Sequence, residues 1–206
     1  MENLKYSLFD LFAFAIPGVF CLTGLRVLAR QPELVQIPAV ITEWSEKTNV
    51  YLAVLIVLVG YVTGHILSLF ASVIIHLLTK LSIFKKPTSS HTATLNNSTR
   101  YILIRELSKE NFKYIEIWNV MAKLYTNIAV IFLILLPGFL FIYRDTIENW
   151  WILAIAIIGV VVVCLLFRRA FDYLQWTVTE MDNCIHEFDL TNAPRTLLQE
   201  ISKKKD

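Results

Sequence analysis

VYLAVLIVLVGYVTGHILSLFASVIIHLLT, residues 50 to 79, is a run of 30 residues that contains no Asp, Glu, Lys or Arg. A helix of this length extends about 45 Å. The hydrocarbon core of a membrane is about 30 Å thick, and about 20 apolar residues are enough to cross it. The run therefore predicts a membrane-spanning helix that either tilts or protrudes from the bilayer.

Three further apolar runs accompany it, at residues 8–29, 128–143 and 150–167. The third of the four runs, 128–143, is short for a span unless residues 125–127 join it. In the whole chain 56% of residues are hydrophobic and only 17% are charged, whereas soluble domains are about one quarter charged. We therefore expect an all-α, polytopic membrane protein with four transmembrane helices and cytoplasmic helical extensions.

The positions of Lys and Arg predict how the chain is oriented. With the N-terminus in the cytoplasm, 15 of the 19 Lys and Arg residues fall on the cytoplasmic side. Cytoplasmic loops of membrane proteins are enriched in these residues. The first apolar run lacks the features of a cleavable signal peptide and is interpreted as a retained anchor. We expect a multi-pass inner-membrane protein with both termini in the cytoplasm.

The chain divides into four segments on this interpretation. Residues 1–80 form a first transmembrane hairpin, 81–126 a cytoplasmic loop and helix, 127–168 a second transmembrane hairpin, and 169–206 cytoplasmic C-terminal helices. Helical spacing continues from about Lys109 into the third span, and it also continues past Arg168 and Arg169 after the fourth. Both cytoplasmic helices are therefore expected to be continuous with a span, and Pro194 is expected to start a short last helix.

Small and polar residues of the second span share one side of the predicted helix. These are Gly60, Gly64, His65, Ser68, Ser72 and His76. Small residues let helix backbones approach closely in lipid, and polar side chains form hydrogen bonds between helices. Ionisable residues inside a membrane can also belong to an ion or proton path. Two interpretations stay open, a helix-packing face and a polar path.

The first span has a comparable face, formed by Asp10, Ala13, Pro17, Cys21 and Gly24. We expect the first two spans to pack antiparallel through these faces, which would bring Asp10 close to His76. The pairs Pro17–Gly18 and Pro137–Gly138 are expected to kink the first and third spans, because proline leaves a backbone carbonyl without its helical donor.

No motif of catalysis, of nucleotide binding or of metal coordination is present, so we expect neither an enzyme nor a cofactor. Direct binding to nucleic acid is not expected either. Trp118, Tyr173 and Trp176 lie on the predicted cytoplasmic helices and are candidates for contact with a soluble protein partner. Arg168 and Arg169 are candidates for the same contact or for anionic lipid.

Three functions remain open at this point. The first is an interaction and sensing subunit that couples an event at the membrane to a soluble cytoplasmic partner. The second is an oligomeric ion channel or pore-forming effector. The third, a membrane enzyme or transporter, is disfavoured because few polar groups converge within the spans.

The stretches FAIPGVF and GYVTGH, together with the size, the four spans and the inward termini, resemble small four-helix membrane proteins of bacterial anti-phage defence systems. The membrane subunit of the Kiwa system is the foremost example, and membrane accessories associated with CRISPR systems are similar in outline. The resemblance implies a homo-oligomer in the inner membrane that senses infection and acts with a soluble DNA-binding partner. It implies no role for any individual residue.

Overall fold

The structure is a computed structural model that describes residues 2–30, 42, 49–81 and 97–187. The described chain is helical and contains no strand. Its helices are α1 (Glu2–Arg30), α3 (Val50–Lys80), α4 (Asn97–Leu107), α5 (Lys109–Ile142) and α6 (Asn149–Glu187). Four of them, α1, α3, α5 and α6, are long and apolar enough to cross a membrane. The predicted all-α class with four helices of membrane-spanning length is confirmed.

The helix boundaries follow local signals in the sequence. Asn49 caps α3, because its side-chain Oδ1 accepts a hydrogen bond of 2.9 Å from the backbone N–H of Leu52. Ser108 separates α4 from α5. The predicted continuous helices are confirmed, since α5 begins at Lys109 and α6 runs past Arg168 and Arg169 to Glu187. The expected last helix from Pro194 lies outside the described residues.

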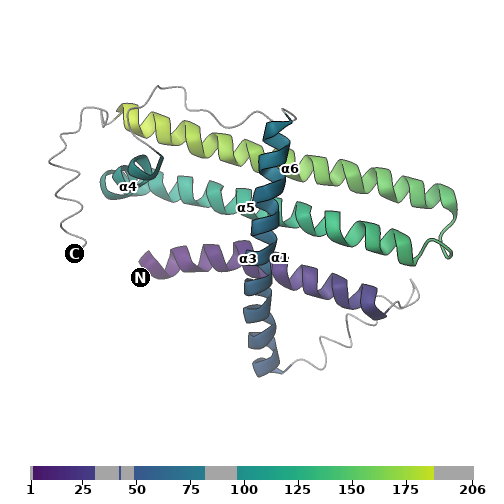
Figure 1. Ribbon diagram of the computed structural model, residues 1–206. Coiled ribbons are helices and arrows are strands. Elements are labelled where there is room, and N and C mark those ends of the chain that lie inside the picture. Colours follow the sequence, from purple (N-terminus) through teal and green to yellow (C-terminus); the bar gives the residue numbers. More distant parts are fainter. Residues whose placement is uncertain (1, 31–41, 43–48, 82–96, 188–206) are drawn as a thin grey trace. The chain divides into compact units, whose positions relative to one another are not determined.

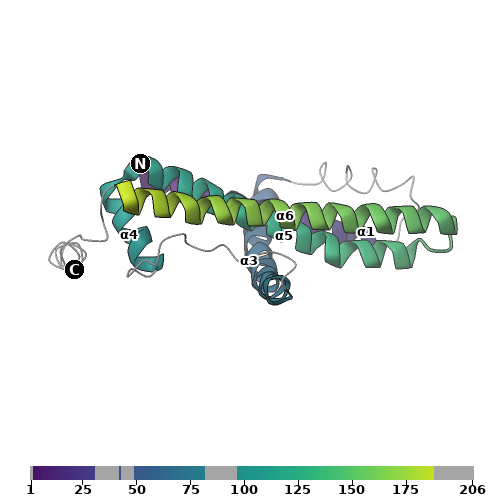
Figure 2. The same ribbon diagram turned by 90° about the horizontal axis from the view of Figure 1, so that it is seen from above.

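The chain forms two compact units, and each is built from two separate stretches of sequence. Unit 1 comprises residues 1–85 and 120–172, and unit 2 comprises residues 86–119 and 173–206. The two expected hairpins therefore belong mainly to unit 1, and the two expected cytoplasmic segments mainly to unit 2. In unit 1 the parts of α5 and α6 run antiparallel and side by side (Figures 1 and 2).

The core of unit 1 draws on all four long helices. Its buried members are Cys21 from α1, Leu67 and Ala71 from α3, Ala129, Val130 and Ile131 from α5, and Val163 and Phe167 from α6. The first half of α3 takes no part in this core, because residues such as Val50, Tyr51 and Leu58 are more than half exposed. Half of α3 thus presents an apolar surface that suits lipid.

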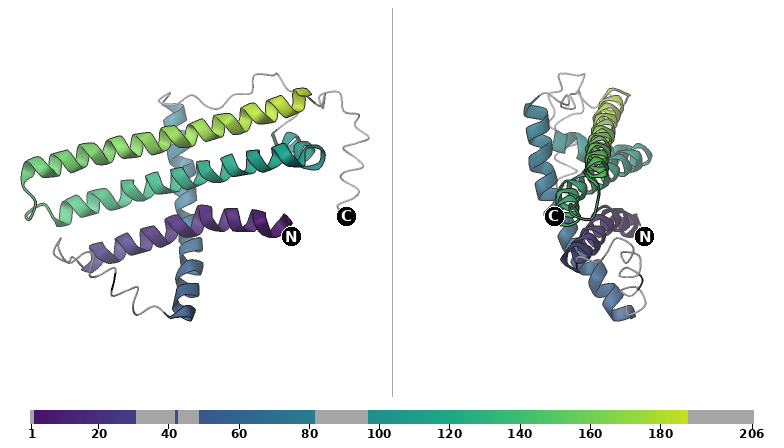
Figure 3. Two further views of the ribbon diagram at one scale, coloured as in Figure 1. Left: turned by 180° about the vertical axis from the view of Figure 1, so that it is seen from behind. Right: turned by 90° about the vertical axis from the view of Figure 1, so that its right-hand side faces the viewer.

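Helices α1 and α3 make their closest approach over a short stretch of each. A Cβ atom added at Gly18 would overlap the carbonyl oxygen of Gly60 and lie 2.9 Å from the backbone nitrogen of Gly64. Glycine at these positions allows the two backbones to touch. Figures 1 and 3 show α3 crossing α1 steeply instead of running alongside it. The first two spans therefore meet through Gly60 and Gly64 as expected, but their expected antiparallel arrangement is not found in this structure.

The expected face of α1 packs against a different helix. Asn127 of α5 contacts the backbone of Ala13, and a side chain at Gly24 would collide with Leu135 of α5. Gly18, which follows Pro17 and is not part of this face, contacts α3 instead. The small residues of α1 are therefore shared between two neighbours, because α1 contacts α3 on one side and α5 on another.

Candidate functional site

The centre of unit 1 contains a polar contact that compensates for a proline. Pro17 has no N–H to donate to the carbonyl of Ala13, four residues earlier in α1. The Nδ2 of Asn127 donates a hydrogen bond of 3.2 Å to that carbonyl, and Ala13 and Asn127 are both almost completely buried. Both α1 and α5 continue through their prolines, Pro17 and Pro137. This contact holds α5 against α1.

His65 lies in an aromatic cluster at the contact of α1 with α3. Its ring stacks on that of Phe14, with centroids 3.9 Å apart and an angle of 18° between the planes. Tyr61 meets the His65 ring edge-on at 4.6 Å, and Lys123 places its Nζ 5.5 Å from the centre of the Phe14 ring. The imidazole is nevertheless exposed. One face of His65 thus packs within the protein while other atoms stay accessible.

The remaining residues of the predicted polar face of α3 differ in burial. Gly60 and Gly64 are buried against α1, and Ser68 is half-buried. Ser72 and His76 are exposed. Asp10 lies within α1, but its side chain is outside the described part of the structure. The small members of the face therefore pack inward, whereas His65, Ser72 and His76 form a stripe that unit 1 does not cover.

Unit 2 is held together by a buried ion pair. The Nη1 of Arg100 in α4 lies 2.8 Å from Oδ1 of Asp182 in α6, and their side chains are 1% and 4% exposed. Unit 2 also contains buried apolar residues from all three of its helices, including Leu103, Ile104, Ile115, Met181 and Ile185. The pair joins α4 to the last part of α6.

Four aromatic residues of unit 2 lie next to one another, the exposed Tyr114 and Trp176 and the half-buried Trp118 and Tyr173. The ring centroids lie 6.4 Å apart for Tyr114 and Trp118, 6.2 Å for Trp118 and Trp176, and 5.1 Å for Tyr173 and Trp176. Tyr114 is 56% exposed and Trp176 is 40% exposed. We call these four residues the aromatic surface. Three of them were predicted candidates, and the structure brings those three together.

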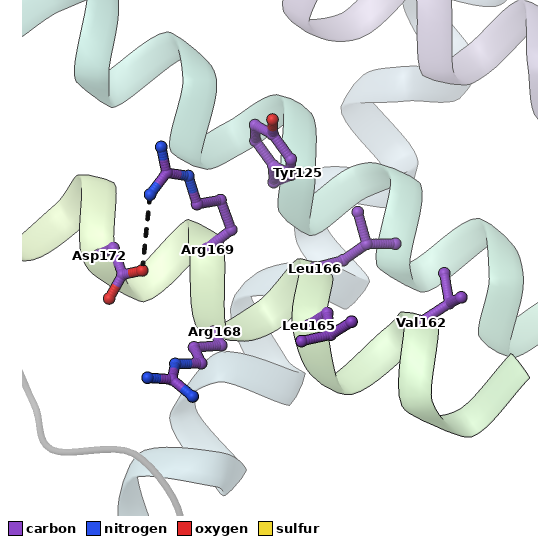
Figure 4. Close-up of a pocket in the computed structure, with 7 residues that line it drawn as sticks. All are labelled: Tyr125, Val162, Leu165, Leu166, Arg168, Arg169 and Asp172. Atoms are coloured by element: carbon purple, nitrogen blue, oxygen red, sulfur yellow. Dashed lines mark ion pairs between the residues drawn. The ribbon is translucent and has the colours of Figure 1, made fainter. Parts of the chain in front are cut away.

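Arg168 and Arg169 lie in unit 1, at one end of a groove of about 510 Å³ between α5 and α6. Val162, Leu165 and Leu166 line its apolar part, and Tyr125 of α5 lies beside Leu166 (Figure 4). The Nη1 of Arg169 is 3.9 Å from Oδ2 of Asp172. Arg168 extends from another side of the helix and forms no ion pair with any residue that the structure describes. The charged side chains thus follow the apolar part of the groove along α6, with the two guanidinium groups on different sides of the helix.

Three functional candidates were missed from the sequence. Asn127 directly precedes the apolar run 128–143, and the only feature that could have identified it was a polar amide side chain next to that run. Arg100 and Asp182 looked like ordinary surface charges in polar segments. Within the described ranges, no three His, Cys, Asp or Glu side chains gather closely enough to hold a metal ion.

Comparison with known proteins does not place the chain in a family. No family model, no curated protein and no solved structure matches it. The resemblance to membrane subunits of anti-phage defence systems therefore stays a prediction from the sequence.

Proposed function

We propose that this chain is a non-enzymatic, multi-pass membrane protein of the cell inner membrane that couples an event at the membrane to a soluble cytoplasmic protein. In this proposal α1, α3, α5 and α6 contain the spans, both termini are cytoplasmic, and unit 2 is the cytoplasmic part. The observation that carries the proposal is the aromatic surface, which lies on helices continuous with two of the apolar segments.

The chemistry of that surface supports a protein partner. Tryptophan and tyrosine are enriched at protein interfaces because they bury a large area at little conformational cost. The exposed aromatic rings of Tyr114 and Trp176 would be more stable if a partner buried them than in contact with water. Four adjacent aromatic rings also form a larger apolar patch than isolated exposed residues do. Because α5 and α6 are each unbroken between their apolar part and unit 2, a movement of either helix in the membrane would reach the aromatic surface.

The test is co-purification of the full chain, tagged and expressed with its neighbouring genes, followed by measurement of the mass of the complex. We expect a stoichiometric soluble protein that is lost on substitution of Trp176→Ala. The matched control is Trp151→Ala, since Trp151 is 50% exposed at the opposite end of α6. Equal recovery of the partner with both variants would contradict the proposed surface, and recovery of a bare monomer would contradict the proposed function.

A second candidate, an oligomeric channel, is favoured by the exposed stripe of His65, Ser72 and His76 on α3. Polar side chains within a span almost always face protein or water, not lipid tails. A homo-oligomer would cover the stripe and place it either in a helix interface or along an aqueous path. Cysteine at Ser72 tests this, because disulfide-linked dimers in membranes are expected if copies meet there. Ion flux through the protein in liposomes, lost in the His65→Ala variant, would show an ion path. Absence of flux would leave the stripe as a helix interface.

A further inference from the structure

We propose that the groove between α5 and α6 at Arg168 and Arg169 binds an anionic phospholipid, with one acyl chain along Val162, Leu165 and Leu166. The inference rests on the membrane placement proposed above. It adds a ligand to that placement, and it does not depend on the aromatic surface or on a protein partner.

The position of the charges along α6 supports this occupant. The apolar part of α6 runs to Phe167 without an acidic or basic residue after Asn149, and the two arginines follow it directly. In the proposed orientation this point is the cytoplasmic boundary of the span, where phospholipid phosphates lie. Basic residues at such a boundary attract anionic headgroups.

The shape of the groove matches the two ends of a phospholipid. Leu165 and Leu166 lie three and four residues after Val162, so they share one side of α6 with it and form an apolar strip. Arg168, Arg169 and Asp172 follow one end of that strip along α6, and the two arginines extend to different sides of the helix (Figure 4). A soluble phosphate would use only the polar end, whereas a lipid would use both.

The charges at the polar end favour an anion. Two guanidinium groups and one carboxylate carry a net charge of +1, counted as two positive charges and one negative. Asp172 lies near Arg169, whereas Arg168 forms no ion pair within the described chain. A guanidinium forms strong charge-assisted hydrogen bonds to phosphate oxygens. An anionic headgroup therefore gains more here than a zwitterionic one.

The second groove of α6 does not share these properties. It has a volume of about 400 Å³ and is lined by apolar side chains with Pro137 and Cys164, and none of its residues is charged. Lipid tails could fill such a groove, but nothing in it would select a headgroup. It serves as the internal comparison for the Arg168–Arg169 groove.

The test is lipid binding to the delipidated full chain in detergent, followed by native mass spectrometry. The probes are dioleoyl phosphatidylglycerol, dioleoyl phosphatidylcholine and glycerophosphoglycerol, which has the anionic headgroup without acyl chains. We expect phosphatidylglycerol to bind most tightly. Each arginine near an anionic headgroup contributes roughly 1 kcal/mol, so we expect about 5-fold weaker binding for Arg168→Gln and about 30-fold weaker binding for the double Arg168→Gln, Arg169→Gln variant.

Two control variants keep the result interpretable. Arg105→Gln removes an exposed arginine of unit 2 and is expected to leave lipid binding unchanged. The double variant Arg168→Lys, Arg169→Lys keeps both charges and is expected to retain most of the binding. If the lysine variant binds phosphatidylglycerol and the glutamine variant does not, misfolding is excluded as the cause.

Three results would overturn the proposal. They are equal binding of the two phospholipids, unchanged binding by the glutamine variant, and equally tight binding of glycerophosphoglycerol. Membrane extraction with alkaline carbonate tests the underlying placement separately. A chain that stays in the membrane but fails to select phosphatidylglycerol would refute this inference and leave the proposed function standing.

Discussion

Asn127 of α5 donates a hydrogen bond to the carbonyl of Ala13 in α1, the carbonyl that Pro17 leaves without a helical donor. The two residues are 114 positions apart in the chain. A proline that weakens one helix is thus compensated by a side chain from another helix. This relationship links the local backbone of α1 to the packing of unit 1.

The first prediction concerns this hydrogen bond. Asn127→Leu is expected to lower the free energy of unfolding by about 1 kcal/mol, because a buried carbonyl left without a donor costs about 1–3 kcal/mol and polar contacts in membrane proteins average about 0.6 kcal/mol. Thermal unfolding in detergent measures the change. In a Pro17→Ala background the penalty should shrink, since residue 17 then supplies the N–H.

The control for this cycle is Thr126→Val. Thr126 is equally buried, but its hydroxyl donates to the carbonyl of Ala122 in its own helix. Its replacement should show no dependence on residue 17. An Asn127→Leu penalty of the same size in both backgrounds would show that Asn127 does not act through the Ala13 carbonyl.

The second prediction concerns the contact of α1 with α3. A Cβ at Gly64 would lie 2.6 Å from the backbone carbon of Phe14, so Gly64→Ala must push the helices apart. We expect a loss of about 1–3 kcal/mol, as for other overpacked contacts. Gly138→Ala is the matched control, because its Cβ would meet only the end of the Leu28 side chain, at 3.0 Å. Equal melting temperatures of the two variants would rule out the close backbone contact.

The third prediction concerns the buried ion pair of unit 2. Arg100→Met breaks the buried ion pair with Asp182, and breaking such a pair typically costs about 3–5 kcal/mol. Urea denaturation followed by tryptophan emission measures the loss. Arg105→Met is the matched control, since Arg105 and Glu106 are 38% and 41% exposed and exposed pairs contribute about 0–1 kcal/mol. Similar losses in both variants would contradict the role of the Arg100–Asp182 pair.

The fourth prediction concerns Cys184, which lies in unit 2 well beyond the apolar part of α6. Burial raises the pKa of the Cys184 thiol above its ordinary value, nearby Glu180 and Glu187 raise it further, and a hydrogen bond with Asn111 opposes them. A raised pKa means less thiolate at neutral pH, and thiolate is the reactive form. Alkylation at pH 7.5 should therefore be far slower than for a free cysteine, and it should accelerate as the pH rises.

Mass spectrometry of the chain with Cys21 and Cys164 replaced by serine measures this rate. Asp182→Asn should accelerate the reaction at constant pH, because loss of the ion pair opens the surroundings of Cys184. A rate in the parent chain equal to that of an unfolded peptide would show that Cys184 is not buried.

The fifth prediction concerns the placement of α3. If α3 spans the membrane in the proposed orientation, a cysteine at Tyr51 is external and a cysteine at Leu81 is cytoplasmic. Both positions are well exposed, at 87% and 67%. An impermeant maleimide applied to intact cells should label Tyr51→Cys and spare Leu81→Cys. Identical labelling of the two would mean that α3 does not cross the membrane. In that case α3 would lie at a steep angle to α1, as in the structure.

The sequence alone predicted the helices well, because the signals for them are local. Apolar runs and the helical spacing after Lys109 each depend on residues within a few turns. The continuity of α6 through Arg168 and Arg169 could be predicted for the same reason. Trp118, Tyr173 and Trp176 of the aromatic surface were also identifiable, since tryptophan and tyrosine stand out in a helical segment rich in charged residues.

The crossing angles of these helices and the pairing of their buried polar groups were decided only in the tertiary structure. Gly60 and Gly64 predicted a close contact of α3 with α1, which the structure contains, yet glycine carries no information about the angle at which the helices cross. Asn127 with Ala13, and Arg100 with Asp182, pair across long separations in sequence, and no local pattern distinguishes them from other amides and charges. The sequence by itself thus determined which segments are apolar helices, and packing between backbones and buried polar groups decided how those helices meet.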